Sequence, residues 1–482
     1  MIRMNFHQKQ LRAFFNVVKQ RPLSILLSIL ILVLLPSNLQ PSIAFPVADN
    51  LQALSLDKYQ RILVFAPHND DETLGAAGVI QLARQNGASI HVVIATNGDG
   101  SLSTALSEFR KVYPASKDFI WIGNIRQQES LAALQDLGLA ADDVDFLSYP
   151  DRGTSYLWEN YWSCEHPFHS PFTNSTYSHY LITYDRDAKY CGNDLFHDLK
   201  KIISDYQPDL ILYPSVDDEH PDHWGLANFV NLTVQVLKLE DSGFDPGMYQ
   251  YLVHRYGFPL PEGYYPNQAL VPPPSLFDID PNWVKVNLPE EAVSLKNEAV
   301  REYKSQLPTL KSLLISFIRQ NELFALPQHP VIGEGQAPDR LDPQTWLDRQ
   351  GNELAPLLLD PIKDNIRREY VSSGDIDRIY SVIVDRELVL CAQMRGIPRA
   401  YNTYTFRFRV YEHGEFDYNL LSTDRDGVAG KLKRKGNYVC GSMPLRDLGN
   451  PEILMLEFDA KTADLATIDR TAWAIVPMNQ YP

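Results

Sequence analysis

Histidine and carboxylate side chains gather at two places in this chain, each directly after an apolar run. The first place is the segment RILVFAPHNDDETLG and the second is LILYPSVDDEHPDHWG. The side chains that can do chemistry there are His68, Asp70 and Asp71 in the first segment and His220, Asp222 and His223 in the second. A catalytic zinc site takes three protein ligands, drawn mainly from His and carboxylates, and leaves one position open. Zinc held in this way acidifies a water molecule, which can then attack a carbonyl carbon.

We expect His68, Asp71 and His223 to hold the metal. His68 and Asp71 are three residues apart on a predicted tight turn between a strand and a helix, so both side chains can face one point. His223 completes a set of two histidines and one carboxylate, which suits zinc and also ferrous iron.

The other residues of the two segments are expected to move protons. Asp70 is not needed to hold the metal and would take the proton of the attacking water. His220 would donate a hydrogen bond to the carbonyl oxygen as negative charge develops on it. Asp222 would hold the His220 imidazole in its charged form.

Each segment alone has a simpler explanation. Carboxylates commonly cap the first turn of a helix, where they also suit the helix dipole. A single His-x-x-His pair is often an ordinary surface feature. Both explanations weaken together, because the two clusters follow two predicted strands of one sheet, where ligands of α/β folds bind. The combination therefore favours a metal site.

The elements that must position these residues alternate between strand and helix over residues 61–256. Strand-like runs occur at 62–66, 90–96, 146–150, 209–214 and 249–254, and helical patterns at 74–86 and 126–137 end at glycines. This alternation predicts a Rossmann-like, mainly parallel sheet with helices on both faces. His68, Asp151 and His220 fall at the predicted carboxyl ends of strands.

Residues 152–193 interrupt the pattern and are predicted to form a long loop beside the site. The loop carries the aromatic side chains Tyr156, Trp158, Tyr161 and Trp162. These rings either stack against sugar rings or pack within a small core of the loop itself.

The pattern changes again towards the C-terminus. A proline-rich stretch at 257–285 is expected to be extended chain, and helical patterns resume at 290–324. Beyond residue 325, short alternating runs predict an all-β, sandwich-like domain at 335–482. Its acids and histidines do not gather at strand ends, so we expect it to hold glycan or brace the catalytic sheet.

The N-terminus reads as an export signal. Residues 1–22 are basic without any acid, and the apolar run at 23–35 is 13 residues long, short of the roughly 20 that span a membrane. Small residues precede a possible cleavage point near Ala44. We expect residues 1–44 to be a cleaved signal peptide or a retained N-terminal anchor. Either places the protein outside the cytoplasm, in periplasm, cell envelope or medium, with membrane association through this segment only.

Charge and cysteines agree with export. Without residues 1–44 the chain carries 39 Lys and Arg against 60 Asp and Glu, a net charge of −21. Such a surface repels polyphosphate chains, so nucleic acid is not an expected partner. Cys164 with Cys191 and Cys391 with Cys440 form two local pairs. They predict two disulfides in an oxidising compartment, the alternative being four buried thiols.

The segment APHNDDE followed by HPDH resembles the N-acetylglucosaminyl-phosphatidylinositol deacetylase family, also called PIG-L or LmbE-like. That family is marked by an (A/P)HPDDE turn and a distal HxDH. Further pieces agree with it in order, namely TNGDG at 96–100, RQQESLAAL at 126–134, YPDRG at 149–153 and KNEAVREYKSQ at 296–306. The resemblance covers roughly residues 58–325.

The resemblance implies a Rossmann-like zinc hydrolase that removes acetyl from an N-acetylated amino sugar. By position, the family's zinc ligands are matched by His68, Asp71 and His223. Its general base and the pair that stabilises the tetrahedral intermediate are matched by Asp70, His220 and Asp222. Positions that help to hold the substrate are matched by Arg126 and Asp151. Asn69 stands where the family usually has proline, which alters turn rigidity more than metal binding.

We therefore expect a deacetylase domain at 50–330 that acts on an N-acetylated sugar or glycoconjugate. The 152–193 insertion and the C-terminal domain exceed the family pattern, which leaves the identity of the substrate open. One alternative is a zinc amidase that cleaves a different amide. Another is an envelope carbohydrate-binding protein with a structural metal, although a closed structural site would not need the additional carboxylate of Asp70.

Overall fold

The computed structural model describes residues 51–109, 114–276, 279, 282–361, 371–422, 432–449 and 451–478. The predicted signal peptide or anchor at 1–44 lies outside the described residues. From residue 48 onward the chain forms one compact unit. Within the described ranges, no helix combines the length and apolar character needed to cross a membrane.

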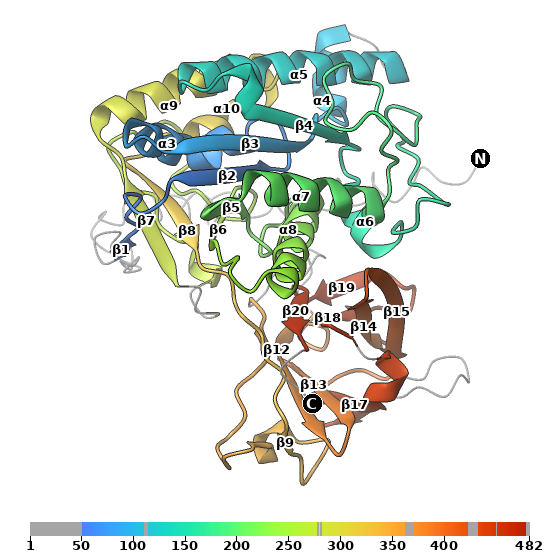
Figure 1. The fold of residues 1–482 in the computed structure, drawn as a ribbon. Helices are drawn as coiled ribbons and strands as arrows, with labels where there is room; N and C mark the ends of the chain where they lie inside the picture. The colour runs from blue at the N-terminus through green and yellow to red at the C-terminus, as the bar shows by residue number, and fades with distance from the viewer. Residues whose placement is uncertain are drawn as a thin grey trace, which may run out of the picture. The chain divides into compact units, whose positions relative to one another are not determined.

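A mostly parallel sheet occupies the N-terminal part of the described chain (Figure 1). Its strands are β1 (Gln52–Ala53), β2 (Arg61–Ala66), β3 (Ser89–Thr96), β4 (Val144–Tyr149), β5 (Leu210–Pro214), β6 (Gly247–Tyr251), β7 (Trp283–Asn287) and β8 (Asn321–Ala325). They lie in the order β1-β7-β8-β6-β5-β2-β3-β4. Among the described strands of this sheet, only the pairings of β8 with β6 and β7 are antiparallel.

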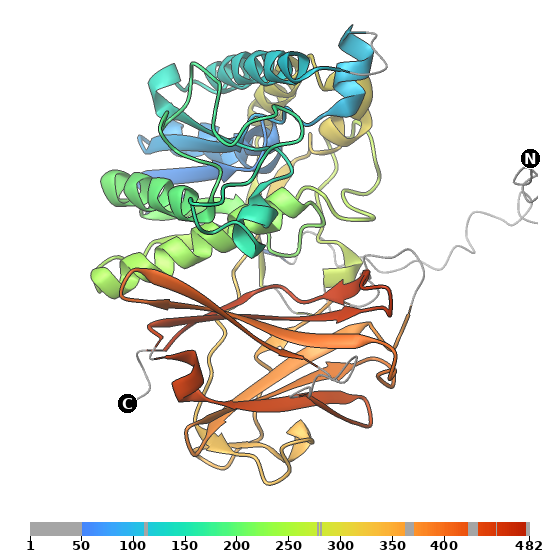
Figure 2. The same ribbon diagram turned by 90° about the vertical axis from the view of Figure 1, so that its right-hand side faces the viewer.

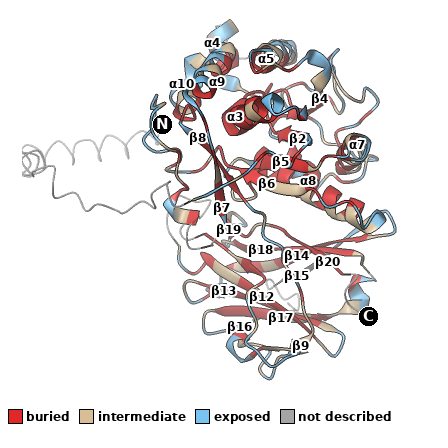
Figure 3. Cartoon of the chain, turned by 60° about the vertical axis from the view of Figure 1, so that its left-hand side comes forward, coloured by how far each residue is buried: buried red, intermediate tan, exposed pale blue. Residues whose placement is uncertain are grey.

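Helices cover both faces of this sheet. They are α3 (Asp71–Gln85), α4 (Leu102–Phe109), α5 (Ser116–Asp136), α6 (Thr154–Glu159), α7 (Gly192–Tyr206), α8 (Pro221–Glu240), α9 (Glu290–Glu302) and α10 (Leu307–Ser316). Alternate β2 residues point to opposite faces, so Ile62 and Val64 pack with α3 and α9, whereas Leu63 and Phe65 pack with α7 and α8. The central strands are accordingly buried on both sides (Figure 3).

The Rossmann-like fold predicted from the sequence is therefore confirmed, with one local error. Residues 290–324 were expected to be helical throughout, but the last of them belong to β8. The strand follows α10 after a short turn and pairs with β7, so tertiary pairing overrides the local helical pattern there.

The C-terminal described residues form antiparallel sheets, as predicted (Figure 2). One sheet contains β11 (Leu358–Leu359), β12 (Ile376–Val384), β13 (Glu387–Met394), β16 (Lys433–Lys435) and β17 (Tyr438–Pro444). The other contains β14 (Thr403–Glu412), β15 (Glu415–Ser422), β18 (Ile453–Lys461), β19 (Thr467–Arg470) and β20 (Ala474–Pro477). Side chains such as Leu390 of β13 and Phe406 of β14 share one core, so the two sheets form a sandwich.

The outer face of the second sheet shares a hydrophobic cluster with α6 and α8. Met455, Trp473 and Ile475 belong to the same buried cluster as Trp158 and Phe229. The Trp158 and Trp473 rings meet edge to face with centroids 5.7 Å apart. The C-terminal region is therefore continuous in packing with the sheet that carries the predicted site.

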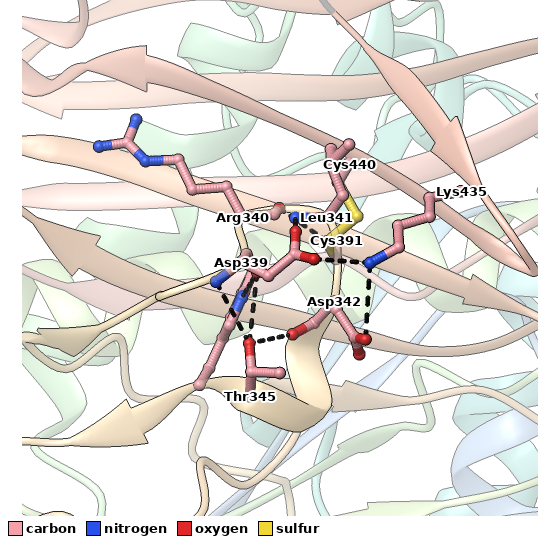
Figure 4. Close-up of a disulfide and its surroundings, with 9 residues drawn as sticks. Asp339, Arg340, Leu341, Asp342, Thr345, Cys391, Lys435 and Cys440 are labelled. Atoms are coloured by element: carbon pink, nitrogen blue, oxygen red, sulfur yellow. Dashed lines mark hydrogen bonds and ion pairs between the residues drawn. A yellow bond between two sulfur atoms is a disulfide. The ribbon is translucent and has the colours of Figure 1, made fainter.

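Both predicted disulfides are present. Cys164 joins Cys191 within the 152–193 insertion, and Cys391 joins Cys440 across neighbouring strands β13 and β17. The second bond lies beside a loop whose Asp339 and Asp342 side chains pair with Lys435 of β16 (Figure 4). Each crosslink lies within one region of the chain, where it limits the conformations of the unfolded segment.

Candidate metal centre

The two histidine-carboxylate segments meet where the strand order of the parallel sheet reverses. From β2 the chain crosses through α3 to β3 on one side, whereas β5 and then β6 lie on the other side of β2. The loops after β2, β5 and β6 therefore leave the same edge of the sheet. A crevice at such a switch point is where α/β sheets bind their ligands.

Three predicted metal ligands converge on one point. The distances are 3.1 Å from His68 Nδ1 to Asp71 Oδ2, 3.1 Å from His223 Nε2 to Asp71 Oδ2, and 3.3 Å from His223 Nε2 to His68 Nδ1. Ligands that hold zinc tetrahedrally at about 2.0–2.1 Å lie roughly 3.3 Å from one another. The three atoms therefore have the spacing of one face of a zinc coordination tetrahedron.

The chemistry of these atoms also fits a metal. Asp71 is fully buried, and its Oδ1 has no hydrogen-bond partner within the described part of the chain. A buried carboxylate oxygen without a partner is costly unless a cation or proton compensates it. His68, Asp71 and His223 would hold the ion.

Carboxylates orient the outer nitrogens of both histidines. His68 Nε2 lies 3.1 Å from Asp222 Oδ2 and 3.5 Å from Asp151 Oδ1. His223 Nδ1 lies 3.0 Å from Asp218 Oδ2. Such contacts fix the ring orientation of a metal-binding histidine and leave its other nitrogen free for the ion.

The surplus of carboxylates controls the pKa values of the two histidines. Burial lowers the pKa of His223, but Asp218 and Asp71 outweigh it and raise this pKa to about 9. Burial also lowers the pKa of His68. Hydrogen bonds to Asp151, Asp222 and Asp71 together outweigh burial and raise this pKa. The centre thus attracts positive charge, which a metal ion supplies in place of the two protons.

Asp70 lies beside the triangle without belonging to it. It precedes α3 as the N-cap residue, yet its side chain makes no capping hydrogen bond. Helix capping, the simpler explanation of this carboxylate, therefore does not apply. Burial, with a further contribution from Asp71, raises its pKa well above the usual range. Its backbone has a φ of +153°, in a region that residues other than glycine seldom adopt.

His220 faces the same centre, but Asp222 does not contact it as expected. The His220 ring lies 4.6 Å from that of His68. Its Nδ1 accepts a hydrogen bond from the backbone N–H of Asp222. Burial, with a smaller contribution from His68, lowers the pKa of His220 to about 3. This lowered pKa favours the neutral ring, and the role of Asp222 in holding the ring charged stays a prediction.

The Asp222 carboxylate is occupied elsewhere. It accepts hydrogen bonds from the backbone N–H groups of Arg152 and Thr154 and from the Thr154 hydroxyl. Its remaining contact is with His68. Asp222 thus joins the start of α6 to a proposed metal ligand instead of acting on His220 through its side chain.

Two residues that sequence reasoning did not single out complete the centre. Asp218 orients His223, as described above, and also accepts backbone hydrogen bonds after β6. His254 follows β6, and its nearest ring nitrogen and the ligand atoms of His68, Asp71 and His223 all lie within 4.8 Å of one another. The sequence signal that could have identified His254 is its position just beyond β6, a strand that neighbours β5.

Arg126 and Asp151 lie beside the centre and fix one loop. Arg126 of α5 donates from Nη1 to the carbonyl oxygen of Gly98 at 2.7 Å, and the absence of a side chain at Gly98 leaves room for this approach. Asp151 accepts from the backbone N–H of Gly100 at 2.7 Å. Both residues are buried. Their role in holding a substrate stays a prediction.

The aromatic residues of the insertion divide between the two possibilities considered from the sequence. Trp158 and Trp162 are buried in the cluster shared by α6, α7 and α8, which leaves their faces unavailable to a sugar. Tyr156 is exposed and stacks on Phe168 with an interplanar angle of 10°. Core packing thus accounts for both tryptophans.

Comparison with known families supports the resemblance read from the motifs. Residues 63–234 match the family described as PIG-L, GlcNAc-PI de-N-acetylase. This stretch runs from β2 into α8 and so contains both segments that meet at the centre. The family expected from the sequence is confirmed for this part of the chain.

Solved structures that align with this chain do so with low sequence identity and low TM-scores. N,N'-diacetylchitobiose deacetylase from Pyrococcus horikoshii is 17% identical, with a TM-score of 0.35, over 56% of this chain and 85% of that one. A deacetylase of the A40926 pseudoaglycone is 18% identical, with a TM-score of 0.33, over 55% and 96%. The 4-carboxy-2-hydroxymuconate hydratase from Pseudomonas putida is 17% identical, with a TM-score of 0.32, over 54% and 82%. Similarity at this level does not identify a substrate.

Proposed function

We propose that this chain, in which residues 63–234 form a PIG-L family domain, is a zinc-dependent hydrolase that removes N-acetyl groups from an amino sugar in a glycan or glycoconjugate. The observation that carries the proposal is the triangle of His68 Nδ1, Asp71 Oδ2 and His223 Nε2, with sides of 3.1, 3.1 and 3.3 Å. A zinc ion bound there would supply a Lewis acid for an amide carbonyl and for water.

Asp70 accepts the proton of the attacking water in this proposal. Its carboxylate is not used by the helix that follows, so it is free to act as a general base, and burial raises its pKa well above the usual range of an aspartate. The proton can then pass to the leaving amine.

His220 stabilises the oxygen that becomes negatively charged. Its Nδ1 already accepts a backbone hydrogen bond, so the neutral ring carries its proton on Nε2 and can donate from there. A pKa of about 3 for His220 agrees with donation from the neutral imidazole. The imidazolium assumed from the sequence is not required.

The protein is proposed to act outside the cytoplasm. Two disulfides, one in the 152–193 insertion and one in the sandwich, support an oxidising compartment. N-terminal sequencing of the protein recovered from separated cell fractions tests this. A mature N-terminus near residue 45, or an intact N-terminus in the membrane fraction, is expected, whereas an intact protein in the cytoplasm contradicts it.

The activity is tested on an array of N-acetylated glycans, read by the mass loss of one acetyl group and by released acetate. Protein stripped by a chelator should be inactive and should recover with zinc. Recovery with ferrous iron alone would reassign the metal. Cleavage of another amide, with every acetylated glycan left intact, would replace the deacetylase by an amidase of the same mechanism.

A further inference from the structure

The outer face of the second C-terminal sheet carries rows of polar side chains. In the pairing of β14 with β18, Arg407 lies opposite Glu457, Thr405 opposite Asp459 and Thr403 opposite Lys461. Further along the same two strands, this face turns apolar and packs on the α/β region. The polar rows therefore begin where the apolar contact ends.

A pocket of about 510 Å³ opens between these rows and the end of α6. Its walls combine charged, hydroxyl, amide and aromatic groups. They are Glu159, Asn160, Thr403, Thr405, Arg407, Asp459, Lys461, Leu465, Thr467, Arg470 and Trp473. The pocket is distinct from the candidate metal centre, with which it shares no residue.

The charges that line the pocket nearly cancel. Arg407 pairs with Asp459, and Arg470 pairs with Glu159 at 3.0 Å. Lys461 lies 3.1 Å from Asp459. A lining with both signs of charge in close pairs favours neither a free anion nor a free cation. It offers donors and acceptors side by side.

Two polar atoms of the lining residues have no hydrogen-bond partner within the described residues. They are Oδ1 of Asp459, a residue that is 1% exposed, and Nε1 of Trp473, which is 6% exposed. Buried polar groups are nearly always paired, so these two atoms mark incomplete hydrogen bonding among the residues that line the pocket.

We infer that this pocket binds a neutral sugar unit. A pyranose presents adjacent hydroxyl groups that both donate and accept hydrogen bonds, which suits a lining with donors and acceptors side by side. Carboxylate, guanidinium and threonine hydroxyl groups are complementary to it. We take this sugar unit to belong to the glycan that the metal centre acts on, and this part of the inference rests on the proposed function.

Two helices connect the pocket with the metal centre. Helix α6 begins at Thr154, which bonds Asp222 beside His68, and ends at Glu159 in the pocket. The Arg470 guanidinium lies 3.8 Å from the centroid of the Trp224 ring, next to His223 on α8. A glycan with one unit in the pocket would be held against the same elements that position the proposed metal ligands.

The test measures binding of neutral tetrasaccharides to the full chain by calorimetry and by saturation-transfer NMR. The probes are cellotetraose, mannotetraose and the tetramer of N-acetylglucosamine, with Asp70→Asn protein used for the acetylated probe. We expect at least one probe to bind. Asp459→Asn and Thr405→Val, both close in shape to the original side chains, should each weaken it about tenfold.

Lys433→Met on the other sheet is the control and should leave binding unchanged, whereas Lys461→Met at the pocket should weaken it. Circular dichroism confirms that each variant is folded. Absence of binding by all probes at millimolar concentration overturns the inference. So does binding that neither Asp459→Asn nor Thr405→Val alters.

Chelation separates this inference from the proposed function. Binding in the pocket should survive removal of metal, while acetate release should not. If acetate is released but both pocket variants bind as before, the pocket assignment fails and the deacetylase stands. If the variants weaken binding but no acetylated glycan loses acetate, the pocket assignment stands and the deacetylase fails.

Discussion

The metal centre and the sandwich pocket both bury charged side chains, yet they arrange them in opposite ways. At the carboxyl ends of β2 and β5, loops about 150 residues apart in sequence bring His68 and His223 to one point, with nitrogens 3.3 Å apart. On β14 and β18, charged residues face one another in a ladder fixed by strand register. Parallel strand ends concentrate chemistry at a point, whereas an antiparallel face spreads contacts along a line.

The electrostatic balance of the two places differs as well. Carboxylates exceed cationic side chains at the metal centre, and this raises the pKa values of His68 and His223. In the pocket, Arg407, Lys461 and Arg470 balance the acids. The first place is suited to a cation and the second to a neutral ligand.

The largest effect should come from removing one of the converging atoms. His223→Ala should abolish both metal binding and acetate release, because it leaves only two of the three proposed ligands. Elemental analysis and acetate release measure the two losses. His91→Ala is the control. It removes a histidine of β3 that pairs with Asp145 of β4, and it should change neither metal binding nor acetate release. Full zinc occupancy in His223→Ala would refute the ligand assignment.

The dependence of the two regions on one another is tested through Trp473. Trp473→Ala should lower the free energy of unfolding by about 3 kcal/mol or more, because it leaves a cavity against Trp158 and Phe229. Denaturant unfolding measures this. Trp121→Ala, at a position that is 42% exposed, should change it much less. Equal effects of the two substitutions would mean that the shared cluster contributes little.

The separation of metal binding from proton transfer is tested at Asp70. Asp70→Asn should keep the metal and lower turnover roughly 100-fold or more, as expected for the loss of a general base. Metal content and acetate release are measured on the same sample. Unchanged turnover would show that another group accepts the proton.

A single unit of pH is expected to have a smaller effect, and it acts on metal affinity. A proton on His223 competes with the metal, and the pKa of His223 is raised to about 9 in the protein without metal. Metal affinity should therefore fall as the pH falls below about 9, by roughly tenfold per pH unit for this one proton. Zinc competition with a chromophoric chelator measures it. An affinity that stays constant from about pH 9 to pH 6 would contradict the assignment.

The sequence allowed the centre to be located but not its contacts. His68 and His223 were predictable because each follows an apolar strand, and parallel strands bring their ends together. His254 was assigned to the end of a strand, and its approach to the centre depends on how the chain leaves β6. The contacts of Asp222 could not be predicted, because the backbone N–H groups of Thr154 and Arg152 that donate to it lie 68 and 70 residues away in the sequence.

The C-terminal region shows the same limit. Alternating runs predicted its sandwich, since strand period is a local property. The pairing of Arg407 with Glu159 at 3.8 Å was not predictable, because it depends on how the outer face of the sheet packs against α6. The expectation that this region holds glycan or braces the catalytic sheet stays a prediction, and the shared cluster favours the bracing role.

At residue 70, the change that would relieve backbone strain would also abolish turnover. Its φ of +153° is costly for an aspartate but open to glycine, so Asp70→Gly should release roughly 1 kcal/mol of strain. The same change deletes the proposed base. A library selected only for heat resistance should therefore enrich glycine at residue 70 and yield folded, metal-loaded and inactive protein. Absence of such enrichment would indicate that the turn is relaxed as it stands.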